Sequence, residues 1–214
     1  MNGPAASTLQ GKGLRGLGRN LRAGLRIALF LPLRASDFRA SPVQYALLVA
    51  FNLFAWLAVS AAQAGFEGEL NPLAVPVFLM DVPLVLATAL AVARIYREEA
   101  LLTLVAVGLT SSGTWFALLG SALNALAADS ALGDVLPGIL LAWVWLAALR
   151  AVAVCAGTVR PKFYIAAFAA TVMVAAAFFA VPKVEVWIAG EGETEVPALA
   201  EERVFHAQGE LIER

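Results

Sequence analysis

The sequence has very little of the chemistry on which metal sites and active sites are commonly built. Among its 214 residues there is one cysteine, Cys155, and one histidine, His206. A single cysteine excludes an internal disulfide framework and a multi-cysteine metal cluster, and a single histidine excludes a paired-histidine metal motif. Cys155 lies in an apolar stretch, where we expect a small packing residue, and His206 lies in a polar tail. Because the thiol and the imidazole cannot meet, we predict no catalysis by this chain and no cofactor.

Charged residues are also scarce. They make up 14% of the chain, whereas 61% of the residues are hydrophobic and the mean hydropathy is +0.79. That is more apolar surface than a soluble core can bury, so lipid must solvate much of it. The sequence contains no phosphate-cradling glycine loop and no nucleic-acid motif, so we expect no nucleic-acid partner.

Five apolar segments are long enough to cross a bilayer, which takes about 20 residues per helix. They are residues 43–62, 72–95, 101–127, 135–157 and 163–181. The expected fold is an all-α integral membrane protein of about five transmembrane helices, preceded by a basic amphipathic helix and followed by a short polar tail. The corresponding domains are a basic segment, 1–42, a transmembrane domain, 43–182, and an acidic tail, 183–214.

The flanking charges predict the orientation of these segments. Twelve of the 15 basic residues lie in the leading segment or in the loops near Arg94, Arg150 and Lys162. The intervening loops carry acidic residues and no lysine or arginine. By the positive-inside rule, the amino terminus is cytoplasmic and the tail periplasmic. Abundant arginine and alanine suit a GC-rich bacterial genome, so we expect a multi-pass protein of the bacterial inner membrane.

The stretch from Leu14 to Leu31 has leucines on one helical face and arginines on another. Such a helix lies in the headgroup plane, where each arginine is attracted to anionic lipid by roughly 1 kcal/mol. The candidate headgroup contacts are Arg15, Arg19, Arg22 and Arg26. A frayed basic tail is the alternative interpretation.

Asp81 is the only acidic or basic side chain well inside a predicted span, where a charge costs about 2.5–3.5 kcal/mol. One interpretation is a proton or cation site at a helix broken by Pro76 and Pro83. The favoured interpretation is structural: Asp81 is an N-cap that starts the second half of the broken helix. Asn52 and Asn124 are each expected to form one hydrogen bond across a helix pair.

Two further patterns concern packing and the tail. Small residues at helical spacing, at Gly113, Ala117 and Ser121 and at Ala166 and Ala170, are expected to let helix backbones approach closely. Residues 184–188 alternate like a short strand, and residues 198–214 read as an amphipathic helix whose apolar stripe needs a partner. A protein partner for the tail or for the helix bundle is therefore expected.

Three short stretches resemble the amino-terminal membrane region of bacterial membrane-anchored legumain-family, caspase-like cysteine peptidases. They are residues 28–34 with 38–41, residues 70–72, and residues 201–208. In that family, several spans precede a caspase-like α/β domain with a catalytic histidine and cysteine. The sequence ends where that domain would begin, so no catalytic residue is carried over, and His206 is not one.

Three functions remain open at this point. The first is a membrane anchor or scaffold that holds a periplasmic partner, or a missing peptidase-like domain, at the inner membrane. The second is a small transporter that uses Asp81. The third is a five-span assembly factor or an accessory subunit of a larger membrane complex.

Overall fold

The five predicted spans are helices in the computed structural model, which describes residues 5–63, 69–127, 132–157, 161–180 and 186–188. The helices are α1 (Ala5–Ala28), α2 (Pro42–Gln63), α3 (Ala74–Leu79), α4 (Asp81–Tyr96), α5 (Ala100–Ala127), α6 (Leu132–Ala156) and α7 (Lys162–Ala180), with a short 3-10 turn, η1 (Ala35–Asp37). Helix α2, the α3–α4 pair, α5, α6 and α7 are each long and apolar enough to cross a membrane. The all-α fold with about five spans is confirmed, with helix limits within a few residues of the predicted segments.

Helix α5 lies at the centre of the bundle. It packs against α1, α2, α4 and α6, while α7 packs against α4 and α6 on the other side. More than half of the α5 span is buried inside the protein, whereas the other four spans leave most of their surface for lipid. The apolar side chains of α5 therefore form the core, and large exposed residues such as Phe54, Phe168 and Phe179 face outward.

The second predicted span is a broken helix. Helices α3 and α4 are separated by Met80, which ends one helix and precedes the other. Pro76 and Pro83 each occupy the third position of their helix, where a missing backbone N–H costs little. The break that the two prolines predict is thus present, and it places Asp81 at the start of α4.

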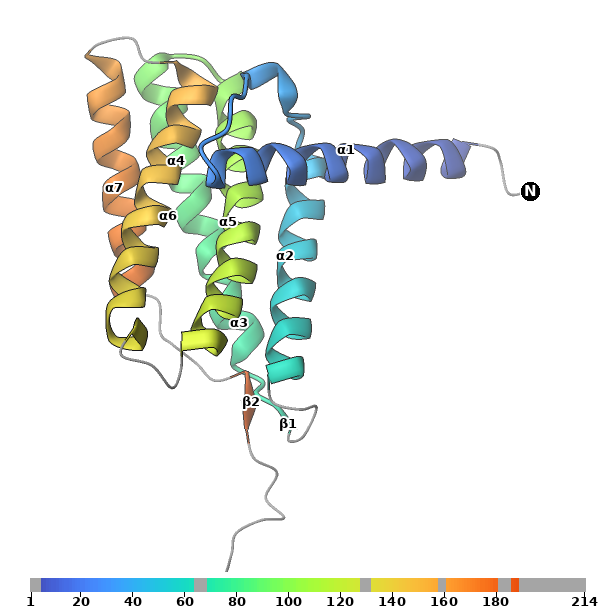
Figure 1. The fold of residues 1–214 in the computed structure, drawn as a ribbon. Helices are drawn as coiled ribbons and strands as arrows, with labels where there is room; N and C mark the ends of the chain where they lie inside the picture. The colour runs from blue at the N-terminus through green and yellow to red at the C-terminus, as the bar shows by residue number, and fades with distance from the viewer. Residues whose placement is uncertain (1–4, 64–68, 128–131, 158–160, 181–185, 189–214) are drawn as a thin grey trace, which may run out of the picture.

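Helix α1 runs across the bundle, transverse to the spans, and its amino-terminal half extends beyond them (Figure 1). Its carboxyl-terminal half is packed closely: Gly24 lies against the backbone of Ser111 in α5, where a Cβ atom would collide. Asn20, which is fully buried, holds the backbone of Arg39, accepting from its N–H at 2.8 Å and donating to its C=O at 3.1 Å. The predicted amphipathic helix is confirmed, and half of it is part of the folded core.

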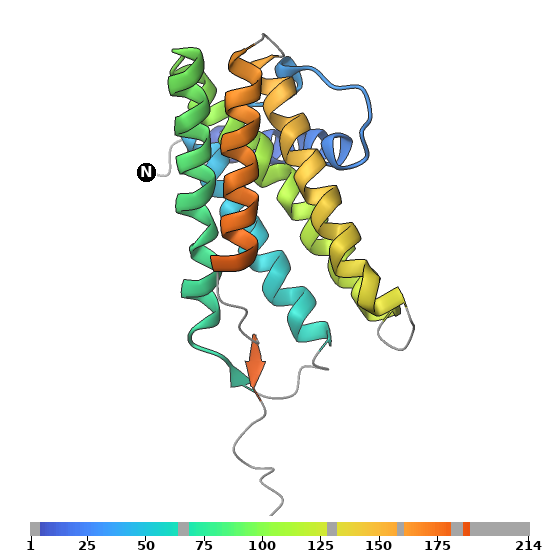
Figure 2. The same cartoon turned by 90° about the vertical axis from the view of Figure 1, so that its left-hand side faces the viewer.

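The two ends of the bundle differ. The basic end of the bundle is defined here by Arg94, Arg97 and Lys162. Helix α4 ends there, and helix α7 begins there. At the opposite end, named here the strand end, β1 (Glu69–Leu70) pairs antiparallel with β2 (Trp187–Ile188) (Figure 2). The predicted strand at 184–188 is therefore present over its last two residues. The predicted helix at 198–214 lies outside the described residues.

Candidate functional site

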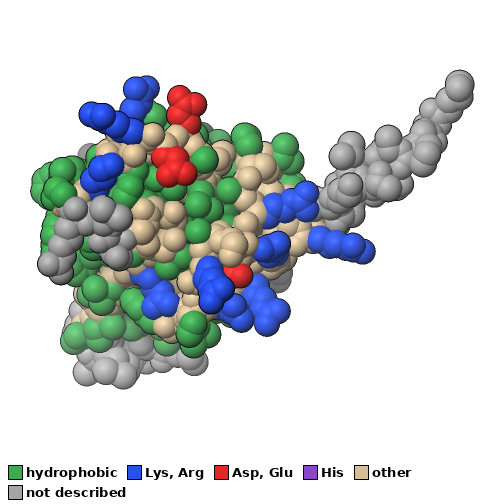
Figure 3. Space-filling model, turned by 90° about the horizontal axis from the view of Figure 1, so that it is seen from above, with side chains coloured by type: hydrophobic (Ala, Val, Ile, Leu, Met, Phe, Trp, Pro, Cys, Tyr) green, Lys and Arg blue, Asp and Glu red, His purple; other side chains and the backbone are tan. Residues whose placement is uncertain are grey.

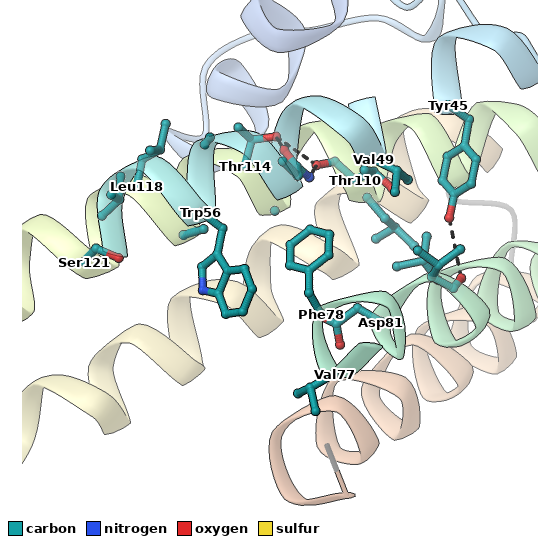
Figure 4. A pocket seen from close by; sticks show the side chains of 18 residues that line it. Tyr45, Val49, Trp56, Val77, Phe78, Asp81, Thr110, Thr114, Leu118 and Ser121 are labelled. Carbon is teal, nitrogen blue, oxygen red and sulfur yellow. Dashed lines mark hydrogen bonds between the residues drawn. The ribbon is translucent and has the colours of Figure 1, made fainter. Parts of the chain in front are cut away.

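A cavity of about 480 Å³ lies between α2, the α3–α4 break and α5. Its walls are largely apolar, and Trp56 of α2 stacks on Phe78 of α3 with ring centroids 5.3 Å apart. Figure 4 shows this aromatic pair with Asp81 beside Phe78. Its volume falls within the range of about 300–1,000 Å³ that is usual for small-molecule sites.

Asp81 is the charged group of this cavity. The structure places it at the first position of α4, and the N-cap position is taken by Met80, with no side-chain cap hydrogen bond. The N-cap interpretation of Asp81 is therefore wrong: the helix break comes one residue earlier than expected. The Asp81 side chain is exposed at the cavity, and no hydrogen bond or ion pair joins it to the described residues.

The α5 wall of the cavity carries a polar network. Asn52 of α2 donates a 3.2 Å hydrogen bond to the backbone C=O of Thr110, and the Thr114 hydroxyl donates to the Asn52 side-chain oxygen. The expected interhelical hydrogen bond of Asn52 is thus confirmed, whereas the Asn124 side chain lies outside the described residues. The Thr110 hydroxyl faces that of Tyr45 but has no hydrogen bond of normal geometry within the described part of the chain.

A second cavity, of about 620 Å³, lies between α4, α5, α6 and α7. Asp81, Val85, Leu109 and Gly113 line both cavities, so the two cavities lie next to each other at this part of the α4–α5 interface. A Cβ atom added to Gly113 would find no other atom within 4 Å. The spacing of Gly113 predicted a close approach of two helices. That prediction is wrong, because Gly113 faces empty space. The other predicted small pair, Ala166 and Ala170, is fully buried.

The arginines of α1 form the other candidate site. Arg15 and Arg22 are exposed, while Arg26 is half-buried near the bundle. The Arg19 guanidinium donates hydrogen bonds to the backbone C=O groups of Ser36 and Asp37. These bonds hold the segment that follows α1 against this helix. Seen from above the basic end, lysine and arginine side chains outnumber acidic ones, and many lie along α1 (Figure 3).

Two tryptophans hold α1 in place, which the sequence did not indicate. The Trp115 indole N–H donates a 2.8 Å hydrogen bond to the Leu21 C=O, and that of Trp143 donates at 2.7 Å to the Ala28 C=O. Trp143 is half-buried, whereas Trp145 is 38% exposed, so the core position typical of a tryptophan deep inside a span does not hold for Trp145. Trp145 donates instead to the Thr171 hydroxyl of α7.

The remaining candidates have simple surroundings. Cys155 is buried in the core, as expected for a packing residue, with its Sγ 3.7 Å from the Leu104 C=O. His206 lies outside the described residues. Within the described ranges, no three His, Cys, Asp or Glu side chains gather as metal ligands would.

In comparisons with known proteins, no family model, curated protein or solved structure matches this chain.

Proposed function

We propose that this chain is a membrane anchor that holds a partner, or a peptidase-like domain, at the outer face of the bacterial inner membrane. The observation that carries the proposal is the β1–β2 pair. Strand β2 follows the last span and is joined to β1, in the connection between α2 and α3, with the Asn71 N–H donating to the Val186 C=O at 2.8 Å. The chain that follows β2 therefore starts from a fixed point on the bundle.

The charges support the orientation in this proposal. Arg94, Arg97 and Lys162 lie at the opposite end of the spans from β1 and β2. Basic residues beside a span are retained in the cytoplasm, so the strand end faces the periplasm. The exposed arginines of α1 then lie along anionic headgroups of the inner leaflet.

The resemblance to membrane-anchored legumain-family peptidases supports the nature of the partner. We expect the DNA that follows codon 214, or a neighbouring gene, to encode a soluble caspase-like domain. In both cases the segment after β2 is the connection between that domain and the membrane.

The test is to express the caspase-like domain together with this chain and to separate membranes from the soluble fraction. The chain carries a site-specific protease sequence inserted after Ile188. We expect the domain to sediment with membranes and to be released by cleavage after Ile188. The matched control carries the same protease sequence after Gly3, where cleavage should release nothing. A domain that remains soluble beside the intact chain would contradict the anchor function.

A further inference from the structure

We propose that the junction of the two cavities, at Asp81 and Gly113, is a binding site for an organic monocation with an apolar body. The class of ligand follows from three properties of the site: one carboxylate, an adjacent aromatic pair, and walls that are otherwise largely apolar. This inference is independent of the anchor function, because it concerns the cavities between the spans and not the segment after β2.

Asp81 is the one charged residue among the described residues that line the two cavities. A carboxylate within a span costs about 2.5–3.5 kcal/mol and is normally paired. No described residue pairs with it, and the basic residue nearest to it along its own helix, Arg94, lies thirteen residues away, or about 20 Å at 1.5 Å per residue. The carboxylate thus has no counterion within its own helix, and a bound cation would supply one.

The surroundings of Asp81 favour an organic cation over a metal ion. A small hard metal ion needs about six oxygen ligands, yet the Asn52 amide oxygen and the Thr114 hydroxyl already bond to each other. The site instead offers Trp56 and Phe78, stacked 5.3 Å apart beside Asp81 (Figure 4). Aromatic faces attract organic ammonium groups, and more strongly where water is excluded. An organic cation satisfies both the carboxylate and the apolar walls.

The junction also has space for the apolar body of the ligand. Gly113 lines both cavities and has nothing within 4 Å of an added Cβ, so the ligand's apolar body can extend from one cavity into the other. The Thr110 hydroxyl, on a residue more than nine-tenths buried, lines the first cavity; it faces the Tyr45 hydroxyl but has no hydrogen bond of normal geometry among the described residues.

The experiment measures binding of tetraphenylphosphonium to the full chain in detergent by calorimetry, beside tetraphenylborate, an anion of the same shape. We expect the cation to bind and the anion to bind at least tenfold more weakly. Asp81→Asn keeps the shape of the side chain, which forms no hydrogen bond with the described residues, and should weaken cation binding at least tenfold. Glu98→Gln, at the exposed basic end, is the matched control and should leave binding unchanged.

Gly113→Phe tests the location independently of charge. It fills the junction without meeting another atom at its Cβ, so the protein should fold and cation binding should be lost. Gly138→Phe is the control, because Gly138 is also unobstructed but lines neither cavity. Equal binding of both ions, or cation binding that survives Asp81→Asn or Gly113→Phe, would overturn the proposal. Equal binding of both ions would identify the junction as an apolar groove for lipid.

Discussion

The indole N–H of Trp143, in α6, donates a 2.7 Å hydrogen bond to the backbone C=O of Ala28, the last residue of α1. The last carbonyls of a helix have no partner within it. Ala28 is fully buried, so its carbonyl cannot turn to water. Trp143 of α6 thus supplies the hydrogen-bond donor that the carboxyl-terminal end of α1 lacks, and this bond holds α1 against the bundle.

Trp143→Phe is therefore expected to loosen α1. It leaves a buried carbonyl without a donor, which costs about 1–3 kcal/mol. Limited trypsin digestion should then cut faster after Arg22 and Arg26, and the midpoint of thermal unfolding in detergent should fall. Trp145→Phe is the control: its indole bonds to Thr171, so it should leave the cleavage rate in α1 unchanged. Equal protection of α1 in Trp143→Phe and the unmodified protein would contradict this role.

Gly24→Leu should separate α1 from α5. Its side chain would occupy the space of the Ser111 backbone, so one helix must move. Overpacking of this kind costs typically 1–3 kcal/mol, and we expect a lower yield of monodisperse protein and faster tryptic cleavage of α1. At Gly18 nothing lies within 4 Å of an added Cβ. Gly18→Ala should instead stabilise the helix by up to about 1 kcal/mol, and a Gly24→Leu protein with unchanged cleavage would show that the two helices do not touch there.

Asn20→Ala should destabilise the turn between α1 and α2. The buried amide satisfies both the N–H and the C=O of Arg39, so its removal leaves two backbone groups without this partner. Each unsatisfied group costs about 1–3 kcal/mol if it stays buried. The comparison is Asn71→Ala, which removes an exposed bond to the Leu73 N–H and should cost less. Thermal unfolding of the two variants in the same detergent measures the difference, and an equal loss in both would refute the special position of Asn20.

The double variant Arg15→Gln, Arg22→Gln should reduce the dependence of stability on anionic lipid. Both side chains are exposed on α1, and each arginine near an anionic surface contributes about 1 kcal/mol. In nanodiscs, the unmodified protein should unfold at a higher temperature in anionic than in zwitterionic lipid, and the double variant should lose most of that gain. Arg97→Gln, away from α1, is the control. If the gain persists in the double variant, α1 does not rest on the headgroups.

The spans were predictable because burial in lipid is encoded by composition over about 20 residues, and the proline pair at 76 and 83 encoded the break. The crossing of α1 over α5 was not, because it rests on single residues. Gly24 is one of 17 glycines, and nothing in its neighbours identifies it as a contact. Trp115 and Trp143 are each compatible with core, interface or lipid, and only the fold brings their indoles to the carbonyls of α1.

The candidate site was likewise predictable in part. Asp81 was recognisable as costly, since its depth follows from the span. Its surroundings were not, because the break came one residue earlier than the N-cap pattern implied and because Gly113 looked like a packing glycine. Whether a small residue supports close contact or leaves a cavity depends on which helix faces it, and that choice is made by tertiary packing.

The proposed anchor depends most on the pairing of β1 with β2 and on the proposed periplasmic location of the strand end, and one engineered disulfide tests both. In a Cys155→Ala background, Glu69→Cys and Ile188→Cys place two thiols on directly opposed residues. We predict that they form a disulfide in growing bacterial cells without added oxidant, because the periplasm is oxidising. The pair Glu69→Cys with Trp187→Cys, whose side chains should point to opposite faces, should remain reduced. A disulfide that forms only after a membrane-permeant oxidant is added would contradict the orientation, and one that never forms would contradict the strand pairing on which the anchor rests.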